Sequence, residues 1–137
     1  ESNNNILKIK HLRITFVSNL NEWRTLYHGR IEGIAKTLVV TNSLFESNSS
    51  FYNGGAVYLS GTDASFENAE FNTNVAYATA NSSGTRYGGG AVYSTGSNSE
   101  FNTVTFTDNR SDFVGGAVAF YSESTEKLSG VTANSNT

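Results

Sequence analysis

Acidic side chains are the residues of this chain best suited to bond-breaking chemistry. A glycosidic bond is hydrolysed between two carboxylates that lie ~5–9.5 Å apart. Three pairs of acids are close together in the sequence: Glu67 with Glu70, Asp108 with Asp112, and Glu123 with Glu126. The chain contains an internal repeat, and these acids occupy different positions within it. All of them fall outside the positions that are expected to face the interior. We therefore expect solvated surface charge and no catalytic residues.

Metal-ligand chemistry has even less support. The chain has no cysteine and only two histidines, His11 and His28, which have no acidic or histidine partner at ligand spacing. The three glycines at 88–90 look like those of calcium-binding repeats, but the aspartates that such repeats require are missing. We expect no metal and no cofactor.

Composition excludes further classes of protein. A formal net charge of −3 argues against a nucleic-acid partner, and no apolar run is long enough for this segment to insert into a membrane. Asn, Ser and Thr make up 50 of the 137 residues, while 12% aromatic residues argue against disorder. Because the chain begins with Glu, we expect it to be a fragment of a longer protein.

Two short motifs recur through the chain and keep a constant separation. Gly-Gly-Ala-Val occurs three times, beginning at Gly54, Gly89 and Gly115. Phe-x-x-Asn occurs four times, beginning at Phe16, Phe45, Phe71 and Phe106. In two places the first glycine of Gly-Gly-Ala-Val precedes the phenylalanine of the next Phe-x-x-Asn by 17 residues. In two places the asparagine of Phe-x-x-Asn precedes the first glycine of the next Gly-Gly-Ala-Val by six. The chain is therefore built from a repeated unit.

The unit reads as a set of short β-strands. Apolar and polar residues alternate before each phenylalanine, and a second extended run follows each Gly-Gly. The only stretch that tolerates a helix is 21–27. Strands recurring about every 26 residues predict an all-β coil in which successive units pair in parallel ~4.8 Å apart.

Parallel stacking of identical units places equivalent residues in columns. The predicted interior aromatic column consists of Phe16, Phe45, Phe71 and Phe106. A second interior column consists of Val40, Phe66 and Phe101. These columns would give a chain with few hydrophobic residues a narrow, continuous core. Val57 is expected to face inward, which leaves Tyr58 and Tyr93 exposed.

Asparagine and glycine mark the two predicted corners of the unit. Asparagine tolerates left-handed backbone, and a buried amide can bond the amide of the next unit. The predicted ladder is Asn19, Asn48, Asn74, Asn109 and Asn136. Glycine is expected where a positive φ or a close backbone approach excludes a Cβ. The corner glycines are Gly54, Gly55, Gly89, Gly90, Gly115 and Gly116.

The two ends of the repeat and one insertion depart from the pattern. Residues 1–36 read as a degenerate first coil or an N-terminal edge, and residues 37–137 as the repeat coils of one domain. A loop insertion at 76–87 carries Tyr77, Arg86 and Tyr87, which form the best candidate for a partner-binding protrusion. Three Asn-x-Ser sequences begin at Asn48, Asn81 and Asn109. Asn81 lies in this loop and is expected to be the acceptor for N-glycosylation if the chain follows a eukaryotic secretory route. Residues 1–36 have net charge +3 and residues 37–137 have −6, which allows head-to-tail attraction between chains.

Gly-Gly-Ala-Val and Phe-x-x-Asn, recurring at a constant separation, resemble the repeat of the chlamydial polymorphic outer membrane proteins. Similar units occur in right-handed parallel β-helix surface proteins, and the likeness covers roughly residues 38–136. The resemblance implies a right-handed parallel β-helix, here of about four to five coils. It also implies an extracellular or cell-surface location and an adhesive, autotransporter-like role.

Three functions follow as hypotheses. The first is a non-enzymatic adhesin or surface stalk that binds other protein chains or a cell-surface receptor or glycan. The second is a structural subunit of an extracellular filament or appendage, in which chains stack end to end because their edges are unpaired. The third is a polysaccharide-active enzyme on the same scaffold.

Overall fold

The described part of the chain is all β. The computed structural model describes residues 6–10, 13–15, 37–61, 63–77, 88–121 and 123–137. Within these ranges there are fourteen strands and no helix. The helix-tolerant stretch at 21–27 lies outside them.

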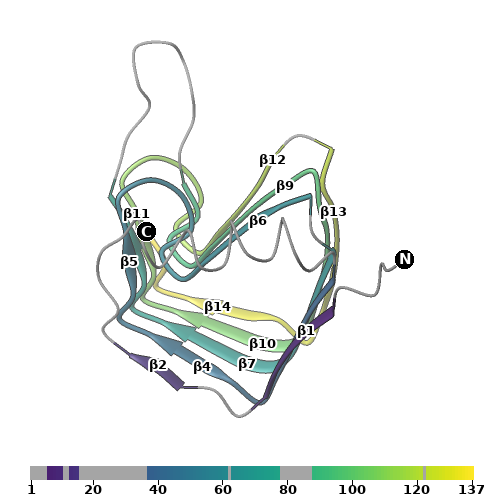
Figure 1. Cartoon of the computed structure of the whole chain (residues 1–137). Coiled ribbons are helices and arrows are strands. Elements are labelled where there is room, and N and C mark those ends of the chain that lie inside the picture. The colour runs from purple at the N-terminus through teal and green to yellow at the C-terminus, as the bar shows by residue number, and fades with distance from the viewer. Residues whose placement is uncertain (1–5, 11–12, 16–36, 62, 78–87, 122) are drawn as a thin grey trace.

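Three sheets hold the strands, and every paired strand runs parallel to its neighbour (Figure 1). The eight-stranded sheet contains β1 (Ile6–Lys10), β2 (Arg13–Thr15), β3 (Thr37–Thr41), β4 (Leu44–Glu46), β7 (Asp63–Asn72), β10 (Asn98–Thr107), β13 (Thr125–Ser129) and β14 (Thr132–Asn134). One three-stranded sheet contains β5 (Ser49–Ser50), β8 (Val75–Ala76) and β11 (Arg110–Ser111). The other contains β6 (Val57–Ser60), β9 (Val92–Thr95) and β12 (Val118–Tyr121).

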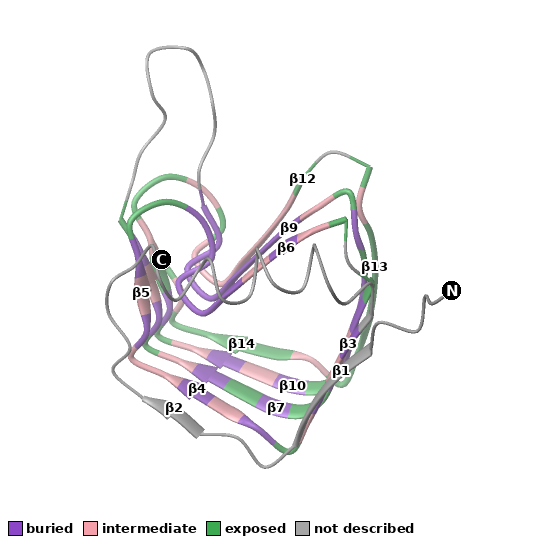
Figure 2. Cartoon of the chain, in the orientation of Figure 1, coloured by how far each residue is buried: buried purple, intermediate pink, exposed green. Residues whose placement is uncertain are grey.

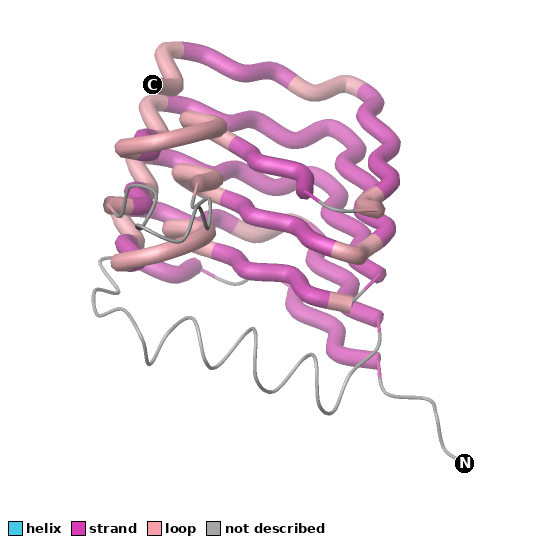
Figure 3. The backbone as a smooth tube through the Cα atoms, turned by 90° about the horizontal axis from the view of Figure 1, so that it is seen from above, coloured by secondary structure: helices cyan, strands magenta, loops and turns pink. Residues whose placement is uncertain are grey.

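The units that the structure describes from β3 to β12 visit the three sheets in the same order. The chain passes from the large sheet to the β5–β8–β11 sheet and then to the β6–β9–β12 sheet before it returns. Successive units lie in layers, one beside the next (Figure 3). The predicted all-β architecture with parallel strands is confirmed.

Long strands turn a corner without losing their inward side chains. In β7, Phe66 and then Ala69 are buried, a spacing of three that breaks the two-residue alternation of a strand. Asn68, between them, has φ 56°. In β10, Thr103 has φ 57° between the buried Phe101 and Val104. One left-handed residue therefore turns the strand and restores the apolar residues to the interior.

Stacked aromatic rings form the centre of the core. The strands that carry these rings, β4, β7 and β10, have buried segments coloured purple in Figure 2. The ring centroids of Phe45 and Phe71 are 4.7 Å apart with an interplanar angle of 6°, and those of Phe71 and Phe106 are 5.0 Å apart at 14°. The rings of Phe66 and Phe101 are 5.0 Å apart at 4°. The two stacks meet edge to face, at 5.7 Å between Phe66 and Phe71. In the preceding unit, the position equivalent to Phe66 is occupied by Val40, which is also fully buried.

The first unit has a different alignment from the one predicted. Ile14 on β2 is the backbone partner of Phe45. Phe16, the predicted member of this column, is two residues further along and lies outside the described residues, as does Asn19. The first unit lacks the Gly-Gly-Ala-Val motif, so a lone Phe-x-x-Asn did not fix its alignment.

Shortening Phe71 to alanine should destabilise the chain by about 3–5 kcal/mol, because this ring is packed between two others and is 0% exposed. Urea unfolding followed by circular dichroism measures the change. Phe51→Ala is the matched control, since Phe51 is 54% exposed. A loss below about 1 kcal/mol for Phe71→Ala would contradict the buried stack.

Candidate functional site

The asparagine ladder is a continuous chain of amide hydrogen bonds. Asn48, Asn74 and Asn109 are 0% exposed. The side-chain nitrogen of Asn48 donates to Oδ1 of Asn74 at 3.0 Å, that of Asn74 to Asn109 at 2.9 Å, and that of Asn109 to Asn136 at 2.9 Å. The backbone N–H of Asn48, Asn74 and Asn109 donates to the same oxygens. Each Oδ1 therefore accepts two hydrogen bonds from the preceding unit.

The second amide hydrogens of Asn74 and Asn109 are also used. Asn74 donates to the carbonyl oxygen of Phe45 at 3.1 Å, and Asn109 donates to that of Phe71 at 2.8 Å. Asn136 repeats this contact with Phe106 at 3.0 Å. Asn74 and Asn109 each connect three consecutive units in this way. The carbonyl oxygens that accept these bonds belong to residues of the aromatic stack.

The left-handed backbone at this corner belongs to a residue other than the one predicted. Positive φ falls on the residue immediately before each ladder asparagine, and these residues are Ser47, Thr73, Asp108 and Ser135. The ladder asparagines are absent from the positive-φ residues. Asparagine is therefore needed here for its amide, and the preceding residue makes the turn that points this amide inward.

The two corner glycines have different roles. Gly54, Gly89 and Gly115 have φ between 64° and 71°, which L side chains rarely adopt. The second glycine of each pair instead lacks room, since a Cβ at Gly90 would overlap the carbonyl oxygen of Gly116. Gly116 is similarly close to the backbone of Thr137, and Gly55 to that of Gly90.

An aromatic corner projects from the segment between the asparagine and glycine corners. We define it by its exposed members Phe51, Tyr52, Tyr77 and Phe113, together with Arg110. The Phe51 and Tyr52 rings are 5.1 Å apart, and the Arg110 guanidinium lies 5.7 Å from the centre of the Tyr77 ring. Arg110 also pairs with Asp112 at 2.6 Å. Three consecutive units contribute to this surface.

The insertion predicted within 76–87 is bounded by described residues on either side. Ala76 is fully buried in β8, and the N–H of Tyr77 donates to the carbonyl of Ser50 at 3.0 Å. The regular path resumes at Gly88, whose N–H donates to Oδ1 of Asn53 at 2.9 Å. The added segment is therefore 78–87. Arg86, Tyr87 and the glycosylation acceptor Asn81 lie outside the described residues.

Asn48 and Asn109 each begin an Asn-x-Ser sequence, but their burial prevents glycosylation in the folded chain. Both amides are 0% exposed, and both hydrogens of the Asn109 amide are bonded within the ladder. A glycan on either side chain is incompatible with the folded chain.

A row of tyrosines crosses the outer side of the β6–β9–β12 sheet, and here one prediction was wrong. Val57 and Val92 face inward as predicted, but Tyr93 is only 5% exposed. The Tyr93 ring lies 5.5 Å from that of Tyr58 and 6.4 Å from that of Tyr121. Rings from the neighbouring strands flank it on both sides. Burial raises the pKa of the Tyr93 phenol, and the nearby Tyr58 and Tyr121 phenols add to the rise.

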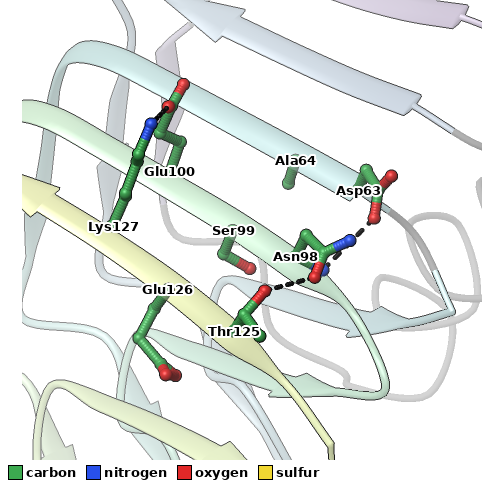
Figure 4. A pocket seen from close by; sticks show the side chains of 8 residues that line it. All are labelled: Asp63, Ala64, Asn98, Ser99, Glu100, Thr125, Glu126 and Lys127. Atoms are coloured by element: carbon green, nitrogen blue, oxygen red, sulfur yellow. Dashed lines mark hydrogen bonds and ion pairs between the residues drawn. The ribbon is translucent and has the colours of Figure 1, made fainter.

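A polar depression of about 410 Å³ lies over β7, β10 and β13 (Figure 4). Several of its polar groups are bonded to one another: Asp63 accepts from the N–H of Asn98 at 3.2 Å, and Asn98 also bonds Thr125. Lys127 pairs with Glu100 at 3.3 Å. Glu126 lines the depression but points away from this pair.

The acid pairs considered for catalysis are all solvent-exposed. Glu67 and Glu70 lie on the outer side of β7, and Asp112 is engaged by Arg110. Of the six acids, only Glu126 contributes to the depression. The depression therefore does not bring a predicted acid pair together. His11 and His28 lie outside the described residues.

No family model, curated protein or solved structure matches the chain. The described residues include no group of three or more His, Asp or Glu side chains able to hold a metal ion. In the same part of the chain, no helix is long and apolar enough to cross a membrane.

Replacing Asn74 with alanine should cost about 3 kcal/mol or more, because several buried groups of the adjacent units lose their partners. Urea unfolding measures the loss. The matched control is Asn102→Ala, at an exposed asparagine of β10, which should change stability by less than about 1 kcal/mol. Equal effects of the two substitutions would contradict the role of the ladder.

Stability should fall at alkaline pH in a way that depends on Tyr93. The folded-state pKa lies above the unfolded value of about 10, so the stabilisation is complete below about pH 10 and is lost as the pH rises through the folded pKa. Urea unfolding between pH 8 and about 11.5 should show a shallower decline for Tyr93→Phe than for the unsubstituted chain. Tyr77→Phe, at an exposed phenol, is the control. An equally steep decline in Tyr93→Phe would disprove this role.

Proposed function

We propose that this chain is a non-enzymatic segment of a right-handed parallel β-helix that acts outside the cell or at its surface as an adhesin or stalk. In this proposal the stacked units provide a rigid support. The aromatic corner and the segment 78–87 inserted beside it provide the contact with a partner.

The supporting observation is the arrangement of apolar side chains. Large buried side chains lie along the centre of the described units, in the phenylalanine stacks and beside them. Outside, the two long strands carry mostly polar side chains, as the exposed positions of β7 and β10 show. Three strongly exposed aromatic rings instead gather at one corner, where Phe51, Tyr77 and Phe113 come from successive units.

Rings of this kind are suited to binding. Tyrosine, phenylalanine and arginine are enriched in protein interfaces, since they bury a large contact area with few rotatable bonds. Arg110 is held over Tyr77 and by Asp112, so its position is partly fixed before a partner arrives. A receptor or glycan on a cell surface is the proposed partner.

The test replaces residues 78–87 by one serine, which gives this unit the same asparagine-to-glycine spacing as its neighbours. A second variant combines Phe51→Ser with Phe113→Ser. Labelled chains are incubated with intact bacterial and animal cells and with immobilised glycans. We expect the unmodified chain to bind and both variants to lose at least tenfold in affinity, with unchanged circular dichroism.

Full binding by both variants, or no binding by the unmodified chain, would overturn the proposal that the aromatic corner and the segment 78–87 contact a partner. Release of reducing or unsaturated sugar ends from polyuronides would overturn the non-enzymatic assignment. The control is Glu126→Gln, a substitution at an exposed residue that lines the polar depression. This variant should bind like the unmodified chain.

The filament subunit is retained as a second candidate because of one feature. The last described unit presents Leu128, which is 58% exposed although its column contains the buried Phe66 and Phe101. Contact between chains at this edge would cover it. Light scattering that rises with concentration, and fibres seen by electron microscopy, would support this alternative over the stalk.

A further inference from the structure

Two tyrosines of neighbouring units are held side by side on the outer side of one sheet. Tyr58 of β6 and Tyr93 of β9 are direct partners in the parallel register. Their ring centroids lie 5.5 Å apart with an interplanar angle of 56°. The residues on either side of Tyr58, Val57 and Leu59, are buried inward, so its ring is fixed to the outer side.

This placement satisfies the geometric requirement of one particular reaction. A dityrosine bond joins the ring carbons next to the two hydroxyl groups. Parallel strands lie ~4.8 Å apart, and an in-register pair carries its equivalent atoms at that separation. Two tyrosines at paired positions therefore hold their equivalent ring carbons near each other, and the ring centroids here are 5.5 Å apart.

The exposed tyrosines have different neighbours among the described residues. Tyr52 packs beside Phe51, and Tyr77 lies under the Arg110 guanidinium. Tyr121 is 48% exposed, but its ring is 6.4 Å from Tyr93 and its backbone partner is Thr95. Tyr58 and Tyr93 are thus the described pair that combines direct register with the shorter ring separation.

We propose that Tyr58 and Tyr93 form an oxidative cross-linking site, at which a peroxidase using hydrogen peroxide joins adjacent units through a dityrosine bond. Each phenol loses one electron and one proton to give a phenoxyl radical. The two radicals couple to form one carbon–carbon bond, and each ring carbon then transfers its hydrogen to oxygen to restore the phenol. One hydrogen peroxide accepts both electrons and both protons and leaves as two waters.

The sequence makes this bond easy to locate. Trypsin cuts after Lys36, Arg86, Arg110 and Lys127, so Tyr58 falls in peptide 37–86 and Tyr93 in peptide 87–110. The full chain is oxidised at low micromolar concentration with horseradish peroxidase and hydrogen peroxide. We expect a monomer that has lost two hydrogens, dityrosine fluorescence, and one cross-linked pair of these peptides whose fragment ions place the bond at Tyr58 and Tyr93.

Conservative variants separate the site from general tyrosine oxidation. Tyr58→Phe and Tyr93→Phe should each abolish the cross-linked pair, because phenylalanine keeps the ring and lacks the oxidisable phenol. Tyr77→Phe removes another tyrosine from the same tryptic peptide as Tyr58 and should leave the yield unchanged. Oxidation in concentrated urea should lower the yield at least tenfold, since the register is then lost.

Several results would overturn the assignment. These are the absence of an intramolecular link in the folded chain, a link that survives Tyr58→Phe, an equal yield in urea, or oxidation that gives only dimers joined through other tyrosines.

Discussion

The buried asparagine amide is the interaction on which the other features of the unit depend. An amide in the interior must satisfy one oxygen and two hydrogens, and an unsatisfied group costs about 1–3 kcal/mol. In this chain Asn74 meets the requirement only because Asn48 and Asn109 stand one unit away on either side. A shift of one residue between units would break these bonds and also unstack the phenylalanines beside them. Polar and apolar columns therefore enforce the same register.

Much of this arrangement was accessible from the sequence because the signal was repeated. A single Phe-x-x-Asn has little meaning, whereas two motifs that recur in phase identify strand pairs before any coordinates are known. The pairing of Phe45 with Phe71 and of Phe71 with Phe106 follows that phase. Where only one motif was present, as at Phe16, the alignment was off by two residues from the observed partner Ile14.

Other features could not be deduced because the periodicity of a sequence does not show the backbone conformation of a residue. Nor does it show which side chains of neighbouring strands cover that residue. The repeat identified a corner at each ladder asparagine but not that the preceding residue, such as Thr73, takes the positive φ. Alternation placed Tyr93 on the outer side of its strand, and this was taken to mean exposure. Its burial comes from tyrosines on the strands to either side, which a strand read alone does not reveal.

The single left-handed residue at each bend of the long strands has an evolutionary consequence. Asn68 and Thr103 reset the inward alternation at the same place in successive units, so the contacts of one unit are reproduced by the next. Duplication of a whole unit within the gene lengthens such a chain while preserving every neighbour relationship. Loss of a single codon inside a strand turns the following side chains of that strand to the wrong side. Growth and recombination in whole units are thus the tolerated routes of change for this architecture.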